Sequence, residues 1–116
     1  MNISRIKNED DIRQALEGYS QFQIDVYLET FKIPKGKVST YGRIAKRIGR
    51  PKAYRAVATT LKNNPLYPVV PCHRVVKEDG SFGGPAERAS GRRDTCLREG
   101  VPIRNGKVVM SKEVVW

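Results

Sequence analysis

The clearest hydrophobic pattern in the chain is helical and lies between Ser20 and Pro34. Ser20 and Gln23 have the spacing of a capping box, and Pro34 cannot continue a helix. Between them, apolar side chains recur every three or four positions, at Phe22, Val26, Tyr27, Leu28 and Phe31. This pattern predicts a core helix. A shorter helical face is predicted upstream, formed by Ile12, Ala15 and Leu16.

Two further short helices are predicted between residues 39 and 63. The first is capped by Ser39 or Thr40 and ends at Gly49, with an apolar face made of Ile44, Ala45 and Ile48. The second runs from about Ala53 to Asn63, with an apolar face made of Ala56, Val57 and Leu61. Two short helices joined by a tight turn with Gly and Pro are typical of a helix-turn-helix.

The outer face of the second helix carries mostly small side chains. We expect this face to hold Ala53, Ala58, Thr59 and Thr60, with Arg55 as its main long side chain. Small outward residues favour close approach of a helix to DNA over many specific base contacts.

The last third of the chain predicts one helix and one hairpin. We expect Ser90 to cap a helix that runs to about Glu99, with Leu97 facing inward and Gly100 as its stop. Residues 103–108 contain Asn-Gly, which suits a type I′ β-hairpin. The predicted fold is mainly α: one winged helix-turn-helix-like DNA-binding domain, residues 1–116, with a short β-hairpin.

Charge adds a candidate partner to this fold. The 116 residues carry a net charge of +10, and no Asp or Glu lies between Glu29 and Glu78, a span with twelve Lys and Arg residues. A field of one sign attracts a polyanion. Nucleic acid is favoured over anionic lipid, because no Trp/Phe-rich amphipathic helix accompanies the charge.

Composition excludes several other classes. No apolar run approaches the length of a membrane span, and the N-terminus has no apolar signal region. Two cysteines in such a chain predict free thiols in a reducing compartment, the cytoplasm or, in a eukaryote, the nucleus. Because Cys72, His73 and Cys96 are the only Cys and His residues, we expect neither a metal site nor a cofactor.

The only histidine directly follows a cysteine, in an apolar segment stiffened by two prolines. Pro68 and Pro71 argue against a long helix here, so the segment presents Cys72 at a defined place. A thiol is nucleophilic as thiolate, and His73 is a nearby base. The pair alone leaves a second interpretation open, a buried structural cysteine beside a core histidine.

Several short motifs together resemble one family, the O6-alkylguanine-DNA alkyltransferases, which repair DNA by direct reversal. The active-site motif of that family is similar to residues 71–75, Pro-Cys-His-Arg-Val. Further matches follow the family's order over roughly residues 20–101: Phe22-Gln23, Ile33-Pro34-Lys35-Gly36, Thr40-Tyr41-Gly42, Arg55-Ala56-Val57, Asn64-Pro65, Gly83-Gly84 and Glu99-Gly100.

The resemblance implies a role for each matching residue. Cys72 accepts the alkyl group, and His73 draws off its proton through water, oriented by Glu99. Tyr41 hydrogen-bonds the target guanine, and Asn64 braces the active-site turn. Arg55 fills the gap left by the flipped nucleotide. The DNA-contacting set implied by the resemblance is Lys35, Thr40, Tyr41, Arg55, Ala56, Thr59 and Arg74.

Departures from the family leave two functions open. Pro85 and Ala86 stand where the family has Tyr and a small residue, Ala58 replaces a glycine, and the resemblance does not include the family's N-terminal domain. These features, with the extension Val101 to Trp116, are similar to alkyltransferase-like proteins, which bind alkylated DNA and pass it to excision-repair proteins.

The leading function is therefore single-turnover alkyl transfer by a monomer acting on duplex DNA that contains O6-alkylguanine. The alternative is a lesion sensor without transfer. A plain helix-turn-helix transcription factor leaves the Pro-Cys-His-Arg motif unexplained.

Overall fold

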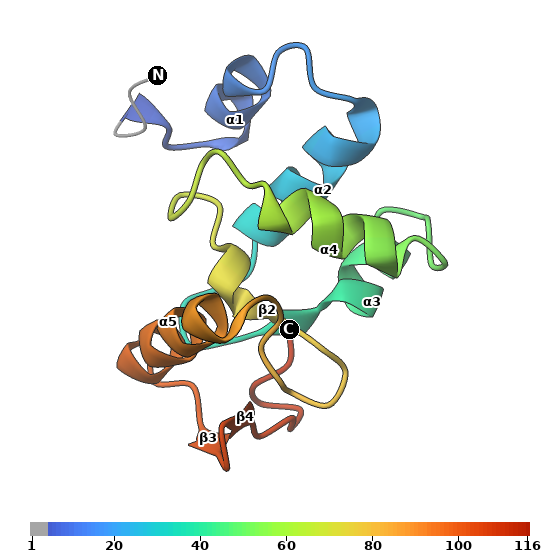
Figure 1. Cartoon of the computed structure of the whole chain (residues 1–116). Helices are drawn as coiled ribbons and strands as arrows, with labels where there is room; N and C mark the ends of the chain where they lie inside the picture. The colour runs from blue at the N-terminus through green and yellow to red at the C-terminus, as the bar shows by residue number, and fades with distance from the viewer. Residues whose placement is uncertain (1–4) are drawn as a thin grey trace.

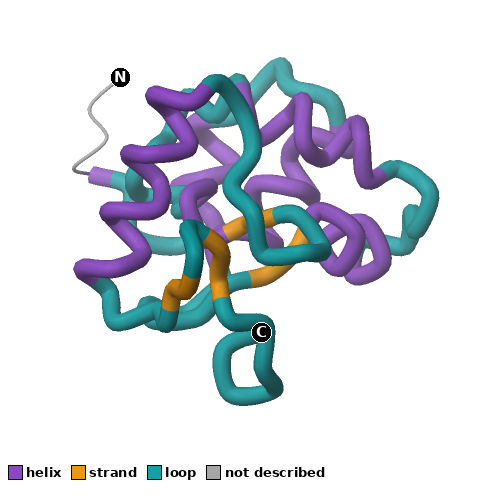
Figure 2. The backbone as a smooth tube through the Cα atoms, turned by 60° about the horizontal axis from the view of Figure 1, so that its bottom comes forward, coloured by secondary structure: helices purple, strands orange, loops and turns teal. Residues whose placement is uncertain are grey.

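The computed structural model describes residues 5–116, which form a mainly helical fold with very short strands (Figures 1 and 2). The helices are α1 (Glu9–Ala15), α2 (Gln21–Phe31), α3 (Tyr41–Arg47), α4 (Tyr54–Lys62) and α5 (Ala86–Arg98), with one 3₁₀ turn, η2 (Cys72–Arg74). The strands are β1 (Ser39–Thr40), β2 (Val75–Val76), β3 (Ile103–Arg104) and β4 (Lys107–Val108). The winged helix-turn-helix-like, mainly α fold predicted from the sequence is confirmed.

The helix-turn-helix forms where the pattern predicts it. The hydroxyl of Thr40 accepts a hydrogen bond from the Arg43 amide and caps α3, while the capping box of Ser20 and Gln23 begins α2. Helices α3 and α4 pack on each other and on α2. This three-helix packing fixes the direction of α4, whose N-terminal end carries Arg55.

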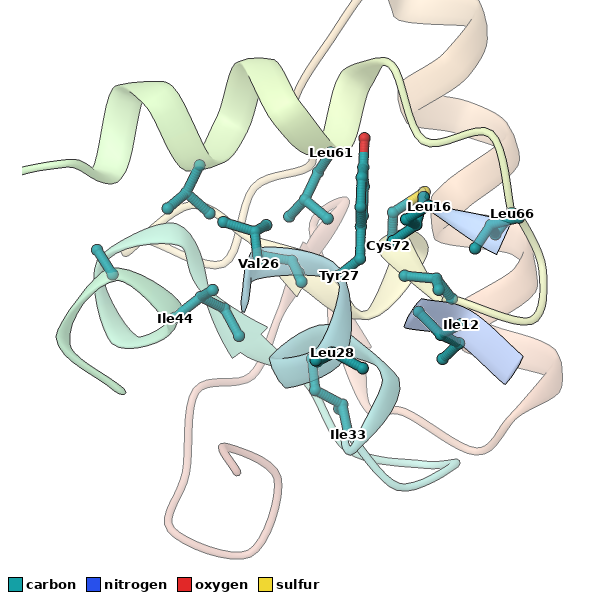
Figure 3. Close-up of a cluster of buried hydrophobic side chains, with 14 of the residues drawn as sticks. Ile12, Leu16, Val26, Tyr27, Leu28, Ile33, Ile44, Leu61, Leu66 and Cys72 are labelled. Carbon is teal, nitrogen blue, oxygen red and sulfur yellow. The ribbon is translucent and has the colours of Figure 1, made fainter. Parts of the chain in front are cut away.

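The described residues form two buried clusters of apolar side chains, one in each half of the domain. The larger cluster contains side chains from helices α1, α2, α3 and α4 and extends to Cys72. Figure 3 shows Cys72 in this cluster, together with Tyr27 and Leu66. The smaller lies under α5 and the hairpin, and contains Val38, Val76, Phe82, Cys96, Val101, Val108 and Val114. Cys72 thus lies at the edge of the larger core, next to the half of the domain that α5 covers.

A parallel pairing that the sequence does not reveal connects these halves. Strand β1, directly before α3, pairs with β2, directly after the 3₁₀ turn that holds Cys72. The C-terminal tail adds to this join, because Val38 exchanges backbone hydrogen bonds with Val114 and Trp116. The start of the helix-turn-helix and the cysteine motif are therefore fixed to each other.

The last helix differs from the predicted one. Helix α5 begins at Ala86 rather than at Ser90, and Cys96 is its buried residue, whereas Leu97 is 50% exposed. The prediction that Leu97 faces inward was wrong, because the longer helix places Cys96 on the inner face. The hairpin is as predicted: β3 and β4 pair antiparallel, with positive φ at Asn105 and Gly106.

One residue of α4 also faces the other way. Thr60 is buried, and its carbonyl accepts a hydrogen bond from the Tyr27 hydroxyl at 2.7 Å. The prediction that Thr60 faces outward was wrong, and so was the prediction that Ala56 belongs to the apolar inner face, because Ala56 is exposed. Thr59 is exposed as predicted. Among the described helices, none is long and apolar enough to cross a bilayer.

Candidate active site

The segment before Cys72 is held in shape by one side chain. The Asn64 amide donates to the Val70 carbonyl at 2.8 Å, and its oxygen accepts from the Leu66 amide at 2.9 Å. These two hydrogen bonds close the 64–70 loop at both ends, as expected of a brace. Pro71 then leads into η2, where Cys72 is 9% exposed.

His73 is held by a buried network of three charged or ionisable side chains. Its Nε2 lies 3.0 Å from Oε1 of Glu99. The Arg74 guanidinium donates to both oxygens of the same carboxylate, at 2.9 and 2.8 Å, and to the Ile33 carbonyl at 2.8 Å. The three side chains are 3–16% exposed, so water screens the network little.

This network determines which nitrogen of His73 carries the proton. The hydrogen bond from Arg74 lowers the pKa of Glu99 to about 2, although burial of the carboxylate acts in the opposite direction. Glu99 is therefore an ionised acceptor at neutral pH, and Nε2 of His73 must donate to it. The other nitrogen, Nδ1, is left as an acceptor, buried and without a protein hydrogen-bond partner in the described part of the chain.

Burial keeps this histidine neutral. The pKa of His73 is lowered from 6.5, chiefly because burial disfavours the charged ring, although Glu99 acts in the opposite direction. A neutral imidazole with an unprotonated nitrogen is a competent general base. The arrangement therefore matches the chemistry expected of the cysteine–histidine pair.

Cys72 opens onto a cavity of about 550 Å³ between the end of α4, the 64–67 loop and α5. Tyr67 forms part of its wall and packs edge-on against the His73 ring, with ring centroids 5.7 Å apart. The lining residues are Leu61, Lys62, Asn64, Tyr67, Cys72, Arg88, Gly91, Arg92, Asp94, Thr95 and Arg98. The cavity is large enough for a small organic group that reaches the sulfur.

Tyr41 lines a second cavity of about 200 Å³, together with Gly83, Pro85 and Arg92. A Cβ atom at Gly83 would lie 2.8 Å from the Tyr41 hydroxyl, so any larger residue here would require the tyrosine side chain to shift. Arg92 lines both cavities and donates to the Gly83 carbonyl at 3.1 Å. The pKa of Tyr41 is raised by burial, and the charge of Arg92 opposes that shift.

The exposed face of α4 carries part of the predicted DNA-contacting set. Arg55, Ala56 and Thr59 are all exposed. Arg55 extends near the ring of Tyr54, 5.9 Å from its centroid, and Tyr54 is itself 48% exposed. The structure therefore presents a cation and an aromatic ring at the N-terminal end of this helix.

Lys35 occupies a different place. It is exposed in the turn after α2, where a Cβ at Gly36 would lie 3.2 Å from the Glu99 carbonyl oxygen. The turn therefore packs beside the C-terminal end of α5 rather than on α4.

Two residues of the predicted DNA-contacting set require correction. The guanidinium of Arg74 is engaged by Glu99 and the Ile33 carbonyl, so it positions the acid instead of facing outward. Thr40 is 1% exposed, and its hydroxyl caps α3. Both side chains make hydrogen bonds within the protein, and motif matching alone does not reveal this.

The second cysteine is packed inside the protein. The Cys96 thiol donates to the His73 carbonyl at 3.2 Å, and burial raises its pKa to about 12. It is therefore inert as a nucleophile, as the sequence predicts.

Sequence reasoning missed the contribution of α5 to the site. Lys62, Arg88, Arg92 and Arg98 line the cavity of Cys72, as does Tyr67. The spacing of Arg88 and Arg92, four positions apart, was the available signal, because it places these two side chains on one face of a helix. Pro85 and Ala86 form the N-cap and first residue of α5, and Pro85 lines the cavity of Tyr41.

Comparison with known proteins gives a consistent set of relatives. The family model described as "6-O-methylguanine DNA methyltransferase, DNA binding domain" matches residues 21–101. A methylated-DNA–protein-cysteine methyltransferase of Methanosarcina mazei is 46% identical over 74 residues, which are 64% of this chain and 46% of that protein. One of Saccharolobus islandicus is 42% identical over 82 residues, 71% of this chain and 52% of that protein. The chain spans about half the length of these curated relatives.

Solved structures of similar fold include proteins bound to DNA. S. pombe Atl1 in complex with damaged DNA containing O6-carboxymethylguanine has a TM-score of 0.73 at 33% identity, covering 83% of this chain and 94% of Atl1. Mycobacterium tuberculosis OGT in complex with DNA has a TM-score of 0.66 at 36% identity, covering 70% of this chain and 50% of OGT.

Proposed function

Because the chain belongs to the 6-O-methylguanine DNA methyltransferase family, we propose that it extrudes O6-alkylguanine from duplex DNA and transfers the alkyl group to Cys72. The observation that carries this proposal is the state of His73. Glu99 holds its Nε2–H, so a neutral Nδ1 is left as a buried proton acceptor directly after the cysteine.

The transfer step balances with the groups present. The thiol proton of Cys72 moves to Nδ1 of His73, through a bridging water. The sulfur then forms a bond to the alkyl carbon, and the bond from that carbon to O6 breaks. Its electron pair stays on guanine, which takes up one proton from water and pairs normally, while His73 returns the proton from Cys72 to water. The thioether has no route back to a thiol, so one protein molecule acts once.

The exposed end of α4 supplies the DNA-binding part of the proposal. A base inside a duplex is out of reach of a buried sulfur, and extruding it costs a few kcal/mol. We expect Arg55, which is exposed with Tyr54 beside it, to enter the stack and offset part of that cost. Ala56 and Thr59 on the same helix allow close approach, Lys35 in the turn beside α5 adds charge, and Tyr41 hydrogen-bonds the extruded guanine.

A lesion sensor remains the second candidate, and one observation favours it. Pro85 lines the cavity of Tyr41 at a position where the family has Tyr, which alters a wall of the pocket proposed for the extruded guanine. In this alternative the protein binds the damaged base, leaves it alkylated and passes it to excision-repair proteins.

The fate of the DNA distinguishes the two candidates. A duplex with one O6-methylguanine is incubated with increasing protein, digested to nucleosides and analysed by chromatography. Repair predicts conversion of the lesion to guanine, with an end point at one lesion per protein molecule and none with Cys72→Ser. An unchanged lesion at excess wild-type protein contradicts transfer and supports the sensor.

A further inference from the structure

The cavity of Cys72 is surrounded by positive charge. Lys62 lies at the end of α4, and the other three cations, Arg88, Arg92 and Arg98, come from α5. We call these three residues the arginine face. Asp94 is the single acidic residue that lines the cavity, and it forms an ion pair with Arg93 at 3.7 Å.

The charges of the arginine face are not neutralised within the protein. None of its three residues, nor Lys62, lies within ion-pair distance of a carboxylate among residues 5–116. Arg92 donates to the Gly83 carbonyl and Arg98 to the Thr95 hydroxyl, both neutral acceptors. The cavity therefore presents net positive charge to whatever enters it.

The group that enters this cavity is defined by the proposed function, on which the inference rests. The carbon attached to O6 must reach the Cys72 sulfur, so the rest of the adduct extends along the cavity toward α5. A methyl group would fill little of the roughly 550 Å³. A longer adduct that ends in an oxyanion would both occupy the space and meet the guanidinium groups, which favour carboxylates through paired hydrogen bonds.

We propose that the arginine face selects O6-guanine adducts that carry a carboxylate, such as the carboxymethyl group, over neutral adducts of the same size. The oxyanion could also come from the DNA backbone. A phosphate contact would strengthen binding to every duplex equally, whereas a carboxylate contact strengthens binding to one lesion only. The two sources are therefore separable by comparing lesions in one sequence.

The test measures equilibrium binding by fluorescence anisotropy, with the full chain carrying Cys72→Ser so that no chemistry occurs. Three duplexes of one sequence are compared: undamaged, with O6-carboxymethylguanine, and with its neutral isostere O6-carbamoylmethylguanine. We expect the carboxymethyl duplex to bind about tenfold more tightly than the carbamoylmethyl duplex. Each partly exposed ion pair contributes only a few-fold, so several together give this ratio.

Substitutions assign the preference to α5. Arg88→Gln and Arg98→Gln should each lower the carboxymethyl-to-carbamoylmethyl ratio about threefold, and Arg88→Lys should retain more of it than Arg88→Gln. Arg104→Gln is the matched control, because it removes the same charge from the exposed hairpin and should leave the ratio unchanged. The ratio is measured within each variant, so a general loss of DNA affinity or stability cancels.

Two results would overturn the inference. One is a ratio near one in the parent protein. The other is an equal loss of affinity for all three duplexes in the arginine variants, which would assign the arginines to phosphates. The proposed transfer to Cys72 is tested separately by conversion of O6-methylguanine with wild-type protein. Either proposal can therefore fail while the other stands.

Discussion

Glu99→Gln tests whether the acid orients the catalytic base. In the wild type, the ionised carboxylate accepts from both Arg74 and His73. A glutamine has one acceptor oxygen, and its amide donates. If the amide points toward His73, Nε2 becomes the acceptor and the ring proton moves to Nδ1, where it blocks proton transfer from Cys72. We expect the single-turnover rate to fall about 100-fold, within the range for general base catalysis.

The same substitution has a stability cost that the structure allows to be bounded. A carboxyl pKa lowered from 4.5 to about 2 corresponds to about 3 kcal/mol in favour of the ionised form. The variant also leaves Arg74, whose side chain is 16% exposed, without its counter-ion. We expect a loss of about 2–3 kcal/mol and a fall in Tm of roughly 10 °C.

The assay separates rate from stability and binding. Alkyl transfer is followed by rapid quench at a temperature where both proteins are folded, and lesion affinity is measured in parallel. Glu113→Gln, at an exposed position in the tail, is the control for loss of one acidic charge. A transfer rate within threefold of wild type, in a folded Glu99→Gln protein, would refute the orienting role.

Three further outcomes follow from the same geometry. The Tm should fall as pH is lowered from about 4.5 toward 2, because the depressed pKa of Glu99 stabilises the fold only above that window, and thermal scans of Glu99→Gln should lose part of this fall. Arg55→Ala should weaken binding to a lesion duplex at least tenfold in anisotropy titrations. Lys35→Ala, in the turn beside α5, should weaken it about two- to threefold. Equal losses for the two variants would contradict the insertion of Arg55 into the base stack. Cys96, with a pKa raised to about 12, should resist iodoacetamide in the folded protein, and peptide mapping that finds it labelled would show the thiol to be accessible.

Local sequence signals were sufficient for most of the helices. The capping box at Ser20 and the Thr40 cap determine where α2 and α3 begin, and both act within a few residues. The Asn-Gly pair likewise determines the hairpin turn. The start of α5 escaped this reasoning because Pro85, its N-cap residue, makes no side-chain capping hydrogen bond.

The site was predictable only as far as the family motifs reach. Resemblance placed Cys72, His73 and Glu99 in one site, and the structure shows the contact between His73 and Glu99. It did not reveal that Arg74 holds Glu99, because that contact depends on how α5 packs against η2. The parallel pairing of β1 with β2 was also hidden, since it joins two-residue strands whose paired residues are 36 positions apart in sequence.

The arginine face shows a similar limit. Its spacing is visible in the sequence, but which side of α5 faces Cys72 depends on the burial of Cys96 against Val76, Val101 and their neighbours. Long-range packing therefore decides whether the arginines face solvent or line the site.

The most direct test of the account is the mass of the protein after prolonged incubation with a duplex that contains O6-methylguanine. The account predicts that each molecule gains one methyl group, and that peptide mapping places it on Cys72 and not on Cys96. Cys72→Ser should stay unmodified while still binding the lesion, because α4 and Arg55 are intact. Wild-type protein that binds the lesion but keeps an unmodified Cys72 would contradict transfer and identify a sensor.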